Sequence, residues 1–240
     1  MASAQDQIGL IMQLRRRGIR DNKVLRAIER VPRELFVDEA FADHAYQDIA
    51  LPIECGQTIS QPTMVARMCE ELRLRGSERV LDVGTGSGYQ AAVLSHLCRR
   101  VYTVERWREL QKAAEKRFAK LGITNVTTII GDGWLGWPPQ APFDRIIVTA
   151  APPESSALTP AGFRRIALAL EGSVEGGHHG HAVRQLRLRV VAGHAGALLA
   201  AGRPRGGVVD GDDRREVAHD VRDRRRDDRL HDCTLVALAL

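Results

Sequence analysis

A glycine-rich stretch, residues 81–90 with the sequence LDVGTGSGYQ, constrains the fold of this chain more than any other feature. Three of its glycines lie within five residues, so the backbone can turn tightly there and approach a ligand, because no Cβ is in the way. The stretch follows an apolar run, RVLDV, and leads into a helical pattern, YQAAVLSHLCRR. A strand that ends in a glycine-rich turn and continues into a helix is typical of parallel α/β sheets with a ligand crevice at that turn.

The alternation of strand and helix patterns continues to about residue 150. Strands separated by helices pair in parallel through right-handed crossovers, and their ligand crevice lies at the carboxyl ends of the strands. The sequence therefore predicts an α/β fold with a doubly wound, mostly parallel sheet. Strands are expected over residues 79–83, 101–105, 126–130 and 144–150, and helices over 89–100 and 108–122.

Residues 1–78 precede this core and have mostly helical patterns. We expect them to form a helical cover together with a loop that contacts the substrate, while residues 79–154 form the α/β core. The helix expected to begin at Pro62 has an apolar stripe that should be buried. The stripe consists of Met64, Val65, Met68 and Leu72.

The composition changes near residue 155. Residues 155–240 contain no Lys, Asn, Tyr, Trp or Met, and they include the mixed-charge run DGDDRREVAHDVRDRRRDDRLHD. Such a segment buries little apolar surface, so we expect it to be largely disordered or loosely docked and the last core strand to have an open edge. Only the stretch RQLRLRVVAG, residues 184–193, alternates as a strand does. A change of reading frame near residue 155 would explain the new composition, and a divergent natural tail is the alternative. In either case we expect the activity of this chain to be reduced.

Composition excludes several classes of function. The net charge of +5 is spread along the chain, which argues against a nucleic-acid partner. No run of apolar residues is long enough to span a bilayer, and the N-terminus lacks the pattern of a secretion signal, so we expect a cytoplasmic monomer that does not bind membranes. The four cysteines are scattered singly and HHGH belongs to a biased segment, so no metal site is expected.

Acidic residues stand at the ends of the first three predicted strands, and the first of them, Asp82, comes just before the glycine-rich turn. Asp82 would oppose the negative pyrophosphate of a dinucleotide but would attract a cationic ligand such as S-adenosylmethionine, directly or through water. Glu105, at the end of the second strand, can accept both ribose hydroxyls, and Asp132, after the third, is placed to accept the adenine amino group. The alternative for each is an ordinary acidic residue at a strand end. Three such residues at successive strand ends favour a cofactor site.

The chain resembles the bacterial protein-L-isoaspartate O-methyltransferases over residues 8–154. The resemblance is carried by VPRELFV, GQTISQPTMVARM, VLDVGTGSGYQAAVL, NVTTIIGDGWLGW and APFDRIIVTAAPPE. It implies the Rossmann-like fold of the S-adenosylmethionine-dependent methyltransferases and a repair enzyme that methylates the free α-carboxylate of L-isoaspartyl residues in peptides and proteins. The alternatives are a catalytically silent module that binds S-adenosylmethionine, and a methyltransferase for another acceptor.

The resemblance also implies the residues of the site. Ser60 matches the family's active-site serine, and Thr58 and Ile59 beside it are expected to line the substrate site. A carboxylate is already a nucleophile at neutral pH, so the enzyme needs to orient it and exclude water, and a serine hydroxyl can do the former. The predicted cofactor-binding residues are Asp82, Gly84, Thr85, Gly86, Gly88, Glu105, Asp132 and Gly133.

Overall fold

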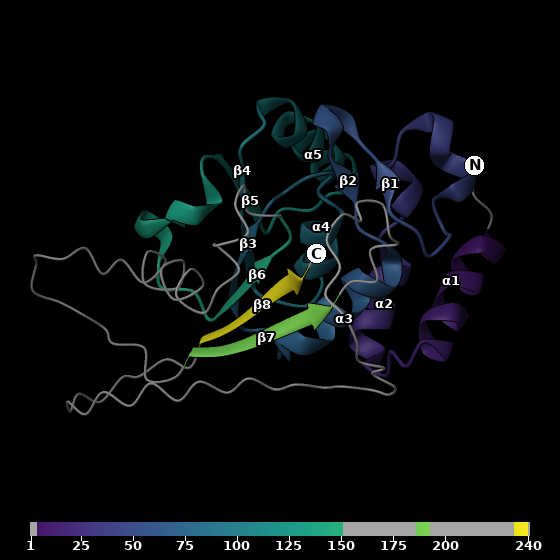
Figure 1. The fold of residues 1–240 in the computed structure, drawn as a ribbon, viewed down its shortest axis with the longest axis horizontal. Coiled ribbons are helices and arrows are strands. Elements are labelled where there is room, and N and C mark those ends of the chain that lie inside the picture. The colour runs from purple at the N-terminus through teal and green to yellow at the C-terminus, as the bar shows by residue number, and fades with distance from the viewer. Residues whose placement is uncertain (1–3, 151–185, 193–232, 240) are drawn as a thin grey trace, which may run out of the picture.

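A computed structural model describes residues 4–150, 186–192 and 233–239. Within them, a sheet of six parallel strands has the order β5-β4-β3-β6-β8-β7 (Figure 1). Parallel pairing follows from the helical crossovers between successive strands. The strands are β3 (Arg79–Val83), β4 (Arg100–Glu105), β5 (Val126–Ile130), β6 (Arg145–Val148), β7 (Leu186–Ala192) and β8 (Cys233–Ala239).

The predicted parallel α/β sheet is confirmed, with its first four strands within a few residues of the expected ranges. The chain runs outward from β3 to β4 and β5, and then returns to place β6 on the other side of β3. In the register, Asp82 lies opposite Thr103 of β4 and Ile147 of β6. The order therefore reverses between β3 and β6, which is where sheets of this kind form their ligand crevice.

Three helices share one hydrophobic cluster with the sheet. They are α3 (Pro62–Leu72), α4 (Tyr89–Ser95) and α5 (Arg108–Lys120). The predicted stripe of α3 is buried, and it packs with Val80, Val101 and Ile147 of the strands. Helix α4 ends sooner than predicted: the Asn125 side chain donates to the carbonyl of Ser95 at 2.8 Å, which satisfies a carbonyl that the end of the helix leaves without an intrahelical partner.

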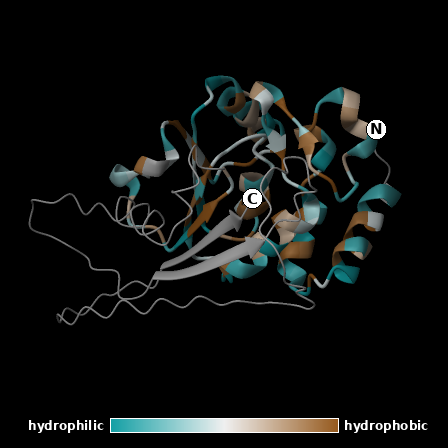
Figure 2. Ribbon diagram, viewed as in Figure 1, coloured by the Kyte–Doolittle hydropathy of each residue, from teal (hydrophilic) through white to brown (hydrophobic). Residues whose placement is uncertain are grey.

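The N-terminal part is mostly helical and packs outside α3 and α4. It contains α1 (Ala4–Arg16), α2 (Asn22–Arg30) and the 3-10 helices η1 (Arg33–Phe36), η2 (Glu39–His44) and η3 (Glu54–Gly56). The strands β1 (Leu51–Pro52) and β2 (Thr58–Ile59) pair antiparallel around η3. Two further 3-10 turns are η4 (Gly133–Leu135) and η5 (Pro138–Gln140). Figure 2 shows hydrophilic and hydrophobic residues mixed along the outer helices, as expected for helices with one buried face.

The expectation of an open edge at β6 is wrong. Strand β8 pairs with β6 in parallel, from Arg145 opposite Thr234 to Val148 opposite Ala237, and β7 pairs with β8 (Figure 1). Backbone hydrogen bonds do not depend on side-chain identity, so an apolar run such as CTLVALA can take the position beside β6. The alternating stretch at 184–193 is confirmed as containing a strand. The expectations for residues 151–185 and 193–232 lie outside the described residues.

Two classes of feature are absent from the described part. Its helices are all too short or too polar to cross a membrane. Its His, Cys, Asp and Glu side chains form no group that could hold a metal ion, and HHGH lies outside the residues considered.

Candidate functional site

A cavity of about 730 Å³ lies at the carboxyl ends of β3, β4, β5 and β6. Its volume is in the range of small-molecule and cofactor sites. The β1–β2 region closes one side of it, so the glycine-rich loop and the loop with Ser60 face the same space. Of the predicted site residues, those that line it are Thr58, Ile59, Ser60, Gly84, Thr85, Gly86, Glu105, Asp132 and Gly133.

Gly84 allows the glycine-rich loop to pass close to the end of β6. Its φ of +105° is a conformation that residues with a side chain rarely adopt. A Cβ at this position would lie 2.8 Å from the Cβ of Ala150 and 3.1 Å from Oγ1 of Thr149. Both neighbours line the cavity, so the glycine keeps its wall open at the point where the strand order reverses.

The backbone N–H groups of the loop are engaged within the protein. The Gly84 and Thr85 N–H groups donate to the carbonyl of Val104 at 2.9 and 3.3 Å. The Gly86 N–H donates to Oε2 of Glu105 at 2.8 Å, and the Gly88 N–H donates to the carbonyl of Thr85 at 2.8 Å. Loops that bind phosphate point such groups at the ligand. These four donors are therefore committed to internal partners, and the loop favours a ligand that has no phosphate.

Glu105 is held rigidly by the backbone around it. Its Oε2 accepts from the Gly86 N–H, and its Oε1 accepts from the N–H groups of Arg106 and Trp107 at 2.8 and 3.0 Å. The residue is 5% exposed and lines the cavity. A carboxylate oxygen can accept more than one hydrogen bond, so the fixed carboxylate can still receive hydroxyl groups of a ligand.

Asp132 and Gly133 complete the wall after β5. The backbone turns directly behind Asp132, where the Leu135 N–H donates to its carbonyl at 3.0 Å. A Cβ at Gly133 would collide with Val83 of β3, so only a glycine lets this turn approach the neighbouring strand. The turn thereby keeps Asp132 in the cavity wall.

Asp82 lies beneath the cavity and does not line it. The side chain is fully buried and accepts from Oγ1 of Thr103 at 3.0 Å and from Oγ1 of Thr149 at 3.3 Å. Burial raises the pKa of Asp82 to about 7; the two hydroxyls oppose this shift and the charge of Glu105 adds to it. Thr149 lines the cavity, so the Thr149 side chain lies between Asp82 and the cavity.

Gly88 does not line the cavity and instead packs closely against α5. Its φ is +90°, and a Cβ there would lie 2.9 Å from Ala114 and 3.0 Å from the ring of Phe118, both on α5. It is the residue that precedes α4. The sequence pattern grouped it with the ligand-binding glycines, but its geometry serves the contact between the loop and α5.

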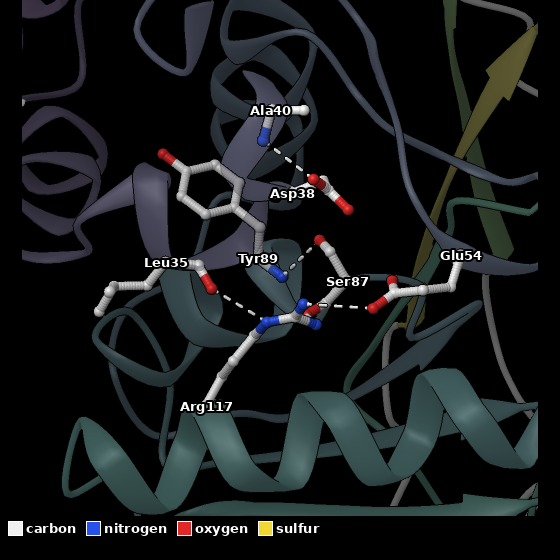
Figure 3. A network of polar contacts seen from close by, with 7 residues as sticks. All are labelled: Leu35, Asp38, Ala40, Glu54, Ser87, Tyr89 and Arg117. Atoms are coloured by element: carbon white, nitrogen blue, oxygen red, sulfur yellow. Dashed lines mark hydrogen bonds and ion pairs between the residues drawn. The ribbon is translucent and has the colours of Figure 1, made fainter. Parts of the chain in front are cut away.

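Arg117 of α5 joins the loop to the N-terminal part (Figure 3). Its Nε donates to the carbonyl of Leu35 at 2.9 Å, and one of its terminal nitrogens donates to the carbonyl of Ser87 at 3.1 Å. The other lies 3.9 Å from a carboxylate oxygen of Glu54 in η3. One side chain thus links the glycine-rich loop to two segments, η1 and η3, that precede the Ser60 loop.

Sequence reasoning missed several residues of the wall. Arg106 and Trp107 line the cavity directly after Glu105, and Trp107 is 39% exposed. Their position directly after Glu105, at the end of a strand, was the feature of the sequence that could have indicated this. Tyr89 also lines the cavity, with its ring edge-on to Phe36 at 5.4 Å between centroids, and the pattern of a buried helix face in the sequence gave no sign of this.

Comparison with known proteins gives the same family along the described core. The family model of protein-L-isoaspartate(D-aspartate) O-methyltransferase matches residues 5–159. The protein-L-isoaspartate O-methyltransferase of Parvibaculum lavamentivorans is 66% identical over 149 residues, which are 62% of this chain and 67% of that protein. The protein-L-isoaspartate O-methyltransferase of Xanthobacter autotrophicus is 60% identical over 149 residues, which are 62% of this chain and 68% of that protein.

A solved structure of a protein-L-isoaspartate O-methyltransferase superposes with a TM-score of 0.58 and 32% identity. The match covers 66% of this chain and 51% of that one. The chain thus spans about two thirds of the length of these curated relatives and about half of the solved protein. The family match includes every residue of the cavity wall described above. The chain belongs to the protein-L-isoaspartate(D-aspartate) O-methyltransferase family.

Proposed function

We propose that this chain binds S-adenosylmethionine in the cavity and transfers its methyl group to the free α-carboxylate of L-isoaspartyl residues in damaged proteins. Family membership supports both the reaction and the cofactor. The observation that carries the proposal is the state of the glycine-rich loop, whose N–H groups at Gly84, Thr85, Gly86 and Gly88 are engaged internally.

The residues of the cavity fit this cofactor. S-Adenosylmethionine carries an ammonium and a sulfonium and no phosphate, and when bound it supplies a methyl group that departs from sulfur without the C–S electron pair. Glu105 and Asp132 offer carboxylates in the wall, and Asp82 offers a third behind Thr149. Carboxylates in a region of low dielectric constant favour a cationic ligand and disfavour pyrophosphate.

Ser60 is the residue we assign to the acceptor. It lines the cavity directly after β2, beside Thr58 and Ile59. An acceptor carboxylate needs no general base, so the hydroxyl has only to hold one carboxylate oxygen in line with the methyl group. The carbonyl of Ser60 accepts from Arg33 at 2.8 Å, which fixes the peptide that carries this hydroxyl.

We also infer a monomeric, cytoplasmic enzyme that does not bind nucleic acid. The spread of charge in the sequence supports the last point. Light scattering of the purified chain tests the monomeric state, and fractionation of the cells that make it tests the location.

Calorimetry tests the cofactor. We expect S-adenosylmethionine and its demethylated product to bind and a nicotinamide dinucleotide not to bind. Ser60→Ala should leave this binding within about twofold of wild type and reduce methyl transfer by at least about tenfold, because it removes orientation and no charge. Binding of the dinucleotide alone would overturn the proposal.

A further inference from the structure

Arg33 places a charge directly behind the acceptor side of the cavity. Its side chain is 0% exposed. One terminal nitrogen donates to the carbonyl of Ser60 at 2.8 Å, and the guanidinium carbon lies 4.8 Å from the centre of the Tyr89 ring. Ser60 and Tyr89 both line the cavity. A buried cation is therefore separated from the cavity by a single layer of residues.

Polar atoms of Arg33 and Tyr89 interact electrostatically with each other but form no hydrogen bond of full geometry in the described part of the chain. Nε and Nη1 of Arg33 and the hydroxyl of Tyr89 are the buried side-chain nitrogen and oxygen atoms there that make no hydrogen bond. All three belong to this one stacked pair. Buried polar atoms are normally satisfied, so the guanidinium charge of Arg33 is only weakly compensated by the described residues.

No described carboxylate lies within ion-pair distance of Arg33. Asp48 acts on it electrostatically, but its two carboxylate oxygens accept from the N–H and hydroxyl of Thr63 at 2.8 and 2.6 Å. Burial lowers the pKa of Arg33, yet an arginine remains protonated at neutral pH. Since a buried charge with so little compensation is unfavourable, an anion bound on this side of the cavity would be stabilised by Arg33.

We propose that Arg33 is a positioning residue that makes the site selective for an acceptor with an ionised carboxylate. The inference rests on the proposed function, whose acceptor is an anion. The guanidinium attracts that anion through a region of low dielectric constant and, by its bond to the carbonyl, holds the Ser60 peptide in place. An acceptor with a carboxamide in place of the carboxylate would gain nothing from this charge.

The test compares two peptides that differ only at this group. An isoaspartyl peptide and the same peptide with its α-carboxylate converted to an amide are titrated into the full chain saturated with S-adenosylhomocysteine. We expect the wild-type chain to prefer the acid by at least about tenfold, and Arg33→Gln to bring the two affinities within about twofold, because only the charge distinguishes the two peptides. The affinity of Arg33→Gln for S-adenosylhomocysteine should stay within about twofold of wild type, because Arg33 does not line the cavity.

Arg67→Gln is the matched control. Arg67 also donates to a backbone carbonyl, that of Arg17 at 2.7 Å, but it is exposed and lies outside the cavity wall. The Arg67→Gln variant should prefer the acid peptide over the amide peptide as strongly as the wild-type chain does. Arg33→Lys, which retains the charge, should keep the preference within about threefold and serves if Arg33→Gln does not fold.

The outcomes separate this inference from the proposed function. The role of Arg33, but not the proposed function, would be overturned by either of two results. One is an Arg33→Gln variant that prefers the acid peptide as strongly as wild type does. The other is an Arg33→Lys variant that binds S-adenosylhomocysteine but no longer prefers the acid peptide. Equal affinity of the wild-type chain for the two peptides would also overturn it. A wild-type chain that binds S-adenosylhomocysteine and neither peptide would overturn the proposed acceptor, and the inference with it.

Discussion

Replacing Asp82 by Asn should stabilise the protein without its cofactor at alkaline pH. The carboxyl group is fully buried, and burial raises its pKa from 3.8 to about 7. The folded state therefore keeps a proton that the unfolded state loses between these two values. In this interval the free energy of unfolding falls as the pH rises, and above about pH 7 the folded state carries the full penalty of the buried charge.

The magnitude follows from the difference of about 3 pKa units. At about 1.4 kcal/mol per unit, the ionised carboxylate costs the folded state about 4 kcal/mol above pH 7 and nothing below the unfolded value. Asparagine removes this cost, but its amide nitrogen faces the hydroxyls of Thr103 and Thr149 and loses about 1 to 3 kcal/mol if it stays unsatisfied. The net gain at pH 8 should be about 1 to 3 kcal/mol.

Urea denaturation at pH 5 and pH 8 measures this difference. We expect Asp82→Asn to be more stable than wild type at pH 8 and equally or less stable at pH 5. The same variant should bind S-adenosylmethionine more weakly, because the cation loses a buried negative charge behind Thr149. A stability difference of the same size at both pH values would refute the reasoning.

Two further predictions concern residues around the site. Glu78→Gln should change stability in the opposite direction to Asp82→Asn. Burial opposes ionisation of Glu78, but backbone N–H groups including those of Arg75 and Gly76 outweigh it and lower the pKa of Glu78. The variant should therefore be less stable than wild type at pH 7, and urea unfolding of both proteins at decreasing pH should show this loss shrink as the pH falls through the lowered pKa. Gly88→Ala combines backbone strain at a φ of +90° with a contact of 2.9 Å to Ala114, and should cost about 2 to 5 kcal/mol in thermal unfolding; a melting temperature equal to wild type would contradict this packing role.

The parallel sheet could be predicted because its signal is local and repeated. Each strand is an apolar run that ends in a turn, and the polar residues of interest follow directly, so the pattern that locates a strand also locates the cavity edge. Glu105 and Asp132 line the cavity for this reason. Ser60 needed the family resemblance, because nothing in its local sequence places the β2 loop opposite the glycine-rich turn.

Other features depend on contacts between distant segments. The burial of Asp82 results from Thr103 and Thr149, which only the sheet register brings to it. Arg33 occurs in VPRELFV like any other surface-prone arginine, and its burial depends on the Ser60 peptide, 27 residues away. The pairing of β8 with β6 joins segments about 90 residues apart, which periodicity does not reveal.

Methyl transfer by the full chain to a pair of synthetic peptides tests the central claim most directly. One peptide contains an L-isoaspartyl residue, its twin contains a normal aspartyl residue, and the methyl group of S-adenosylmethionine is radiolabelled. We expect base-labile label on the isoaspartyl peptide and none above background on its twin, because the proposed acceptor is the free α-carboxylate that only the isoaspartyl linkage leaves, and family membership supports this acceptor. Equal labelling of the twins, or no labelling of either by a chain that binds the cofactor, would contradict the account.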